Sequence, residues 1–144
     1  TLVHKSLVAR FARTFGTLIQ SGVPHLEALD ILQASTNNVH MKDAVASVQE
    51  SIREGAGFAV PMGESGIFDD IVINMVDVGE QTGELDSMLT KVADRYEVEV
   101  EQTVDTTFKL IEPILLVVMA VAVGFIVFAL FMPLLTMMQQ MSKR

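Results

Sequence analysis

The sequence predicts an all-α protein in which six helices are followed by one membrane-spanning segment. Apolar residues recur at steps of three and four through the first 112 residues, as expected of amphipathic helices. No charged residue occurs between Glu112 and Lys143, and this stretch is rich in Leu, Val, Ile, Phe and Met. The two patterns together indicate a helical bundle on a membrane stalk.

The uncharged stretch has the length of a transmembrane helix. As a helix, the 22 residues from Ile114 to Leu135 span about 33 Å, close to the hydrocarbon thickness of a bilayer. The alternative is a buried core helix of a soluble protein. We divide the chain into a helical domain at 1–112, a transmembrane helix at 113–138 and a short polar tail at 139–144. Pro113 removes a backbone hydrogen bond and is expected to bend the helix where it enters the membrane.

Three helices are expected in residues 1–55. Gly22 can close the first helix in a left-handed conformation, and Pro24 suits the start of the second. Asn38 is expected to cap the third helix, which stops at Gly55. The residues predicted to be buried are Leu7, Val8, Phe11, Phe15, Leu18, Ile19, Leu26, Ala28, Leu29, Ile31, Leu32, Met41, Ala44, Val45, Val48 and Ile52.

Three more helices are expected after Gly55. Residues 55–66 predict a loop with one short helical turn around Phe58–Met62. A fifth helix follows and stops within residues 79–85, and a sixth begins at Leu85 with Thr82 as a candidate cap. The fifth helix is predicted to bury Phe68, Ile71, Val72, Met75 and Val76 and to hold Asp69 and Asp70 near its positive end.

Residues 96–108 fit two interpretations. They alternate polar and apolar side chains and are rich in β-branched residues, which is typical of a strand. The apolar residues also fit helical steps, no turn residue lies between Leu85 and Glu112, and a lone strand would have no partner. We therefore predict one long helix that runs into the membrane.

The charges are unevenly distributed. Residues 1–55 carry five basic and five acidic residues, whereas residues 56–112 carry three basic and thirteen acidic ones. Such a surface disfavours nucleic acid and favours a basic protein partner or a divalent cation, with a well-solvated face as the alternative. We expect this acidic half to be one docking surface, and charge reversal at several of Asp94, Glu97, Glu99 and Glu101 to weaken partner binding. The chain has no Cys, which excludes disulfides and thiolate metal sites.

Four carboxylates gather around Gly79 and Gly83, namely those of Asp77, Glu80, Glu84 and Asp86. They are candidates to hold a hard cation such as Ca²⁺, with Glu80 and Glu84 as its ligands. Their spacing is not that of an EF-hand loop. The alternative is that Glu84 and Asp86 stabilise the start of the sixth helix electrostatically.

No motif indicates catalysis or a cofactor. His4, His25 and His40 lie in three different segments without ligand spacing, and we expect them at the surface or at helix caps. No nucleophile elbow or phosphate loop is present. Within the membrane segment, Ala120 and Gly124 form a small-xxx-small pair that permits close approach of another helix.

Three motifs resemble the F-domain family of inner-membrane platform proteins in type II secretion and type IV pilus assembly. Residues 11–29, from Phe-Ala-Arg-Thr-Phe-Gly to His-Leu-Glu-Ala-Leu, are similar to the family's start. Residues 79–85 resemble its Gly-Glu-x-x-Gly-x-Leu signature, through Gly79, Glu80, Gly83 and Leu85. Glu112 and Pro113 before an apolar helix, with Pro133 near its end, resemble its third membrane segment.

The resemblance implies six helices arranged as two antiparallel three-helix units, followed by a membrane helix. Family members usually carry two such domains and three membrane segments, so we expect a C-terminal third of a larger protein, in keeping with a chain that begins at Thr1. The implied role is non-enzymatic and needs no cofactor. The platform would oligomerise in the bacterial inner membrane with residues 1–112 in the cytoplasm, meet the assembly ATPase there, and help to insert pilin or pseudopilin subunits.

The alternative function is that of a membrane-tethered helical sensor or a transporter fragment. A sensor is expected to show a ligand pocket or a signalling domain, and a transporter places charges within its membrane helices. The sequence shows neither feature. The charge count also leaves membrane orientation open, because Arg95 and Lys109 lie on one side of the apolar stretch and Lys143 and Arg144 on the other.

Overall fold

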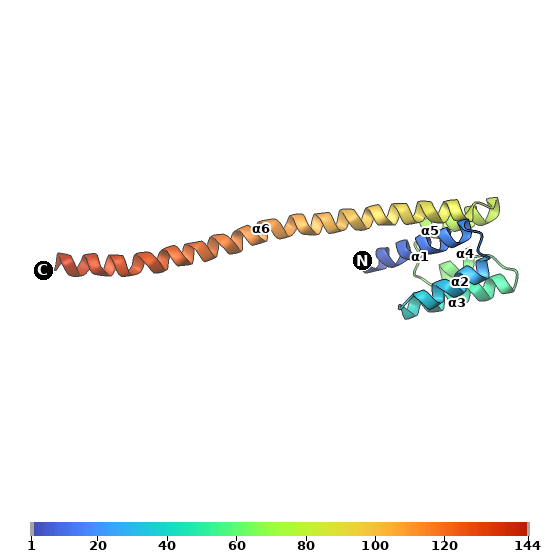
Figure 1. Ribbon diagram of the computed structural model, residues 1–144, viewed down its shortest axis with the longest axis horizontal. Coiled ribbons are helices and arrows are strands. Elements are labelled where there is room, and N and C mark those ends of the chain that lie inside the picture. Colours follow the sequence, from blue (N-terminus) through green and yellow to red (C-terminus); the bar gives the residue numbers. More distant parts are fainter. Residues whose placement is uncertain (1, 144) are drawn as a thin grey trace. The chain divides into compact units, whose positions relative to one another are not determined.

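The computed structural model describes residues 2–143, and its regular elements over this range are all α-helices (Figure 1). They are α1 (Leu2–Gln20), α2 (His25–Ser35), α3 (Val39–Arg53), α4 (Ala59–Glu64), α5 (Asp70–Thr82) and α6 (Leu85–Ser142). The predicted all-α class, with six helices and a long apolar last helix, is confirmed. The chain forms two compact units, one ending at Gln102 and the other starting at Thr103.

Glycine and asparagine end or begin the helices where the sequence predicts. Gly22 follows α1 with a φ of 86°, and Gly55 follows α3 with a φ of 81°. The Val23 N–H donates to the Leu18 carbonyl at 3.0 Å, which closes the end of α1. The Asn38 side chain accepts from the Met41 N–H at 3.0 Å and caps α3.

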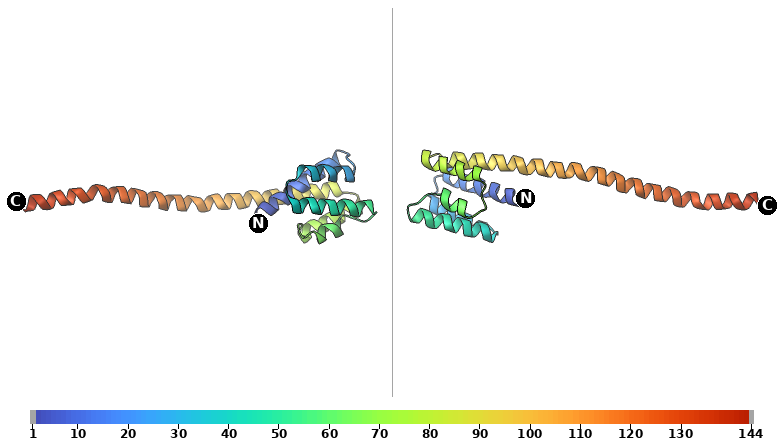
Figure 2. Two further views of the ribbon diagram at one scale, coloured as in Figure 1. Left: turned by 90° about the horizontal axis from the view of Figure 1, so that it is seen from below. Right: turned by 180° about the vertical axis from the view of Figure 1, so that it is seen from behind.

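The core of the first unit is formed around α1. Figures 1 and 2 show α1 between the first turns of α6 on one side and the α2–α3 pair on the other. Four phenylalanine rings pack at its centre: Phe11 lies 5.0 Å from Phe68, and Phe15 lies 5.7 Å from both Phe11 and Phe58, measured between ring centroids. These contacts tie α1 to the segments that flank α4.

Two isoleucines that the sequence analysis placed in the core are exposed. Ile31 is 40% exposed and Ile71 is 45% exposed. The buried stripe of α2 consists of Ala28, Leu29 and Leu32, and Ile31 lies to one side of it. Hydrophobicity alone therefore made the predicted face of each helix too wide.

The end of α5 lies within residues 79–85, as predicted. The helix continues through Gly79 to Thr82, and Gly83 follows it in a left-handed conformation with a φ of 77°. Gly79 faces α6 instead of ending α5: a Cβ there would lie 2.9 Å from the Cα of Leu85 and 3.0 Å from the Cγ of Met88. Because Gly79 has no side chain, the backbone of α5 at this position packs closely against Leu85 and Met88 of α6.

The last helix settles the ambiguity of residues 96–108. They are helical within α6, so the strand interpretation is wrong. Pro113 and Pro133 both lie inside this helix. The most apolar 18-residue stretch of α6 has a mean hydropathy of 3.2. None of this stretch is buried, whereas the core helix of a soluble protein would be mostly buried. By length and composition, α6 is able to cross a membrane.

Two glycines give a matched test of helix packing. We expect Gly79→Ala to lower the free energy of unfolding by about 1–2 kcal/mol, because its methyl group overlaps the backbone of Leu85. Gly63→Ala in α4 places the same methyl group 3.7 Å from Ile73 Cδ1, an ordinary contact, and should stabilise by about 0.5–1 kcal/mol. Urea unfolding in mild detergent measures both through Tyr96, the single tyrosine of a chain without tryptophan. Equal effects of the two substitutions would contradict the close approach at Gly79.

Candidate functional site

Glu80 fastens the loop before α4 to α5. Its Oε2 accepts from the Phe58 N–H at 3.0 Å. A Cβ on Gly57 would lie 2.6 Å from Glu80 Oε1, so the carboxylate occupies the space that any other residue would fill. Ser51 Oγ holds the same loop from α3 by donating to the Gly57 carbonyl at 2.9 Å. Glu80 thus has a structural partner 22 residues away, which sequence analysis did not find.

The carboxylates around Gly79 and Gly83 do not assemble into a metal site. Glu80 points to Phe58, and Asp77 Oδ1 accepts from Gln81 Nε2 at 3.1 Å. Glu84 is exposed in the turn between α5 and α6. Over residues 2–143, no group of three or more His, Asp or Glu side chains is placed to hold a metal ion. Glu80 and Glu84 belong to no such group in this range, and their role as Ca²⁺ ligands stays a prediction.

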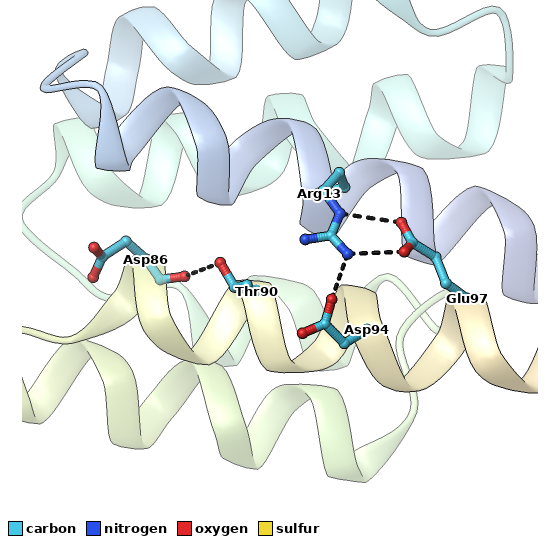
Figure 3. Close-up of polar contacts among 5 residues, drawn as sticks. All are labelled: Arg13, Asp86, Thr90, Asp94 and Glu97. Atoms are coloured by element: carbon cyan, nitrogen blue, oxygen red, sulfur yellow. Dashed lines mark hydrogen bonds and ion pairs between the residues drawn. The ribbon is translucent and has the colours of Figure 1, made fainter.

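A second set of charged residues joins α1 to α6 (Figure 3). Arg13 Nε and Nη2 lie 3.1 and 2.8 Å from the two carboxylate oxygens of Glu97, and Nη2 also donates to Asp94. Two residues further along α6, Glu99 Oε2 lies 2.9 Å from Lys5 Nζ. We call this set of five residues the α1–α6 ion-pair seam. The bidentate contact of Arg13 with Glu97 favours one position of α1 relative to the first turns of α6.

The seam changes the pKa values of its members. Hydrogen bonds to Glu97 and then to Asp94 hold the pKa of Arg13 above its ordinary value. The hydrogen bond from Arg13 lowers the pKa of Glu97, and the hydrogen bond from Lys5 lowers that of Glu99. Each shift favours the charged form of its group. Because the side chains remain partly exposed, the net gain in stability is modest.

The seam includes three of the four acidic residues at which charge reversal is expected to weaken partner binding. Asp94, Glu97 and Glu99 are paired with Arg13 and Lys5 in α1. Glu99 also lies 3.4 Å from Arg95 within α6. Glu101 is the fourth member of the predicted surface and is exposed. Three of these four residues are therefore already paired within the unit.

Tyr96 joins α6 to the start of α5. Its ring is 4% exposed, and its hydroxyl donates to the Asp69 carboxylate. Burial and then the contact with Asp69 raise the pKa of Tyr96, so the hydroxyl keeps its proton. Asp69 stands at the N-cap of α5, yet its side chain makes no capping hydrogen bond. Asp69 thus lies at the positive end of α5, as predicted, and its carboxylate also binds Tyr96.

The remaining predicted site residues fall in two places. Leu85 is buried, 4% exposed, and lies against Gly79. Glu112, Pro113, Ala120, Gly124 and Pro133 are all exposed along α6. Within residues 2–143, nothing lies within 4 Å of a Cβ built on Gly124. The small pair at Ala120 and Gly124 thus leaves room for another helix, and its contact with one stays a prediction.

The fold and the site define a class of protein. It has a helical unit that ends at Gln102, which we call the head, and its last helix continues into a segment able to cross a membrane. Residues 11–133 match the family described as "Type II secretion system (T2SS), protein F". The chain therefore belongs to the family of type II secretion system protein F. This confirms the resemblance that the three sequence motifs indicated.

Relatives carry names from two related systems. "Type IV pilus assembly protein PilC" of Myxococcus xanthus is 39% identical over 136 residues, which is 94% of this chain and 33% of that protein. "Type II secretion system protein F" of Aeromonas hydrophila is 39% identical over 127 residues, 88% of this chain and 33% of that protein. A Pseudomonas aeruginosa "Type IV pilus assembly protein PilC" is 38% identical over 133 residues, 92% of this chain and 36% of that protein. The chain thus spans about a third of the length of these relatives.

The ion-pair seam predicts a pH-dependent stability that depends on Arg13. In the folded chain the pKa of Glu97 lies below its ordinary value of 4.5. Its contribution is therefore fully present above the unfolded pKa and is lost as the pH falls through the lower folded pKa. We expect Arg13→Met to cost about 1 kcal/mol at pH 7 and the difference from the unchanged chain to shrink below about pH 4.

The matched control is Lys91→Met, which removes an exposed cation from α6 that no ion pair in the described range uses. Unfolding in urea, followed by Tyr96 fluorescence at a series of pH values, measures both variants. A constant difference between Arg13→Met and the unchanged chain down to pH 3, or an equal effect of Lys91→Met, would argue against the seam.

Proposed function

We propose that the chain is the C-terminal part of a non-enzymatic platform subunit in the inner membrane of a type II secretion or type IV pilus machine. The family match over residues 11–133 is the observation that carries the proposal. Relatives with names from both systems support a role shared by the two machines. The alternatives of a sensor or a transporter fragment gain no support from these relatives.

In the proposed arrangement, the helical domain 1–112 lies in the cytoplasm and residues 113–138 cross the inner membrane. The platform forms a homo-oligomer, meets the assembly ATPase on the cytoplasmic side and helps to insert pilin or pseudopilin subunits into a growing fibre. An acidic domain supports protein partners and disfavours nucleic acid as a ligand. Helix contacts at Ala120 and Gly124 would serve the oligomer or a neighbouring membrane subunit.

The proposed mechanism is mechanical transmission along α6. Its first turns contribute buried residues Leu85, Leu89 and Val92 to the head, and the same helix extends to Ser142. A helix is stiff over a few turns, because every backbone hydrogen bond is made inside it. Movement that the ATPase imposes on the head would therefore reach the membrane through this helix.

An insertion between Glu112 and Pro113 tests transmission. Seven residues add about 10 Å and return the helix to nearly the same rotational phase. We expect a Gly-Ser insert of this length to abolish fibre assembly or secretion in the full-length protein, and an Ala-rich helical insert to retain part of it. Fractionation confirms that both variants reach the inner membrane. Normal fibre assembly or secretion with the Gly-Ser insert would contradict transmission and would leave α6 with the role of a membrane anchor.

Docking of the ATPase is tested at carboxylates outside the seam. Glu64 at the end of α4 and Glu84 before α6 are exposed. We expect Glu64→Lys combined with Glu84→Lys to reduce ATPase capture by the purified full-length protein several-fold. The control, Glu27→Lys with Glu54→Lys, makes the same change of charge at exposed positions in the balanced half of the domain. Equal capture by both double variants would contradict docking on the acidic half.

A further inference from the structure

Arg10 is the cation of α1 that the ion-pair seam does not use. Lys5 and Arg13 pair with carboxylates of α6, whereas Arg10 is exposed and forms no ion pair with any residue that the structure describes. A guanidinium is nearly always charged and presents several donors in one plane. Arg10 therefore offers an unused site for a carboxylate.

The cavity beside Arg10 on the α2–α3 side has an apolar floor. Its volume is about 370 Å³, within the range of pockets that hold ligands or anchoring side chains. Its floor is formed by Leu7, Phe11, Leu32, Met41 and Val45. Residues 35–38 at the α2–α3 turn form a polar rim. Arg10 is the one charged side chain among the described residues that line it.

Two further cavities adjoin the first along the outer face of α1. One, of about 400 Å³, lies toward Glu97 and Glu101 of α6, and the other, of about 360 Å³, is lined by Leu2 and Val100. The three cavities share Arg10, and neighbouring pairs also share other residues of α1. We call the first and the third of these cavities, which share Val3, Leu7 and Arg10, the Arg10 groove. The residues of α1 that belong to more than one of the cavities are Val3, Ser6, Leu7, Arg10 and Thr14.

We propose that the Arg10 groove binds a segment of a partner protein that carries a bulky apolar side chain and a carboxylate on one face. The apolar side chain fits the floor between Leu7 and Met41, and the carboxylate pairs with Arg10 at the edge. Charge selects this occupant, because no carboxylate of the described residues lines the two cavities of the Arg10 groove and a basic segment would meet Arg10 with a like charge. Arg beside an apolar pocket is also a frequent centre of binding energy.

This surface is distinct from the acidic half that the proposed function assigns to the ATPase. It lies on α1 and the α2–α3 turn, within the half of the domain whose charges balance. It would therefore let the head hold two partners of opposite charge at once. The proposal does not depend on which machine the chain serves, since binding is measured without fibre assembly.

The test uses the full chain in phospholipid nanodiscs and two short fluorescein-labelled helical peptides. In one, two leucines and a glutamate share a face; in the other, lysine replaces the glutamate. We expect the acidic peptide to bind at least about tenfold more tightly by fluorescence anisotropy, which corresponds to about 1.4 kcal/mol. Arg10→Glu should reverse this preference, and Lys91→Glu, the same change of charge on α6, should leave it intact.

A second variant tests the apolar part of the groove. Val3 is 77% exposed, so the neutral change Val3→Asn should weaken binding of the acidic peptide while the Tyr96 fluorescence of the folded chain stays unchanged. Absence of saturable binding, equal affinity for both peptides, or a preference that survives Arg10→Glu would overturn the proposal. Light scattering tests whether a second copy of the chain occupies the groove instead. A dimer that forms without peptide and is lost in Arg10→Glu would assign the groove to that second copy, and this result would also overturn the proposal.

Discussion

The head depends on the first turns of α6, which pack between α1 and α5 with two glycines at the contacts. On one side a Cβ built on Gly79 of α5 would lie 2.9 Å from the Cα of Leu85, and on the other a Cβ on Gly16 of α1 would lie 3.2 Å from the Cβ of Leu89. Because neither glycine has a side chain, both neighbouring helices approach α6 closely. Leu85 and Leu89 are buried as a result, and the contact contributes both area and dispersion energy.

Polar contacts fix the register of this packing without supplying most of its energy. Arg13 and Lys5 set the position of α1 along α6, and Tyr96 with Asp69 sets the start of α5. The ion pairs are partly exposed and each adds little to stability. Their directional geometry nevertheless favours the observed register, because a shift of either helix by one turn would separate the paired groups.

The sequence predicted the fold well where the signal is local. A glycine after the last turn and an asparagine before the first one act on their own helix, so Gly22, Gly55 and Asn38 were identified correctly. The period of apolar residues and the lack of turn residues were enough to choose a helix over a strand for residues 96–108.

The site was predicted poorly because its contacts join distant segments. Glu80 meets Phe58, and Arg13 meets Glu97, 84 residues along the chain. No spacing rule indicates such partners, since only packing of the core brings them together. Ile31 and Ile71 show the same limit, because a helix buries the face that its neighbours cover and not every apolar residue it carries.

The same limit applies to charge as a guide to partners. Of the thirteen acidic residues between positions 56 and 112, six have internal partners: Asp69, Asp77, Glu80, Asp94, Glu97 and Glu99. A hydrogen-bonded carboxylate still contributes to the long-range field, which steers encounter, but it has fewer free oxygens for a direct contact. The net charge of the sequence therefore predicts the sign of the partner's charge more reliably than it predicts where on the domain the partner binds. Among the described residues of this half, the carboxylates without an internal partner lie at the end of α4, around the ends of α5 and beyond the seam in α6. A docked partner would therefore contact a smaller acidic surface than the net charge suggests.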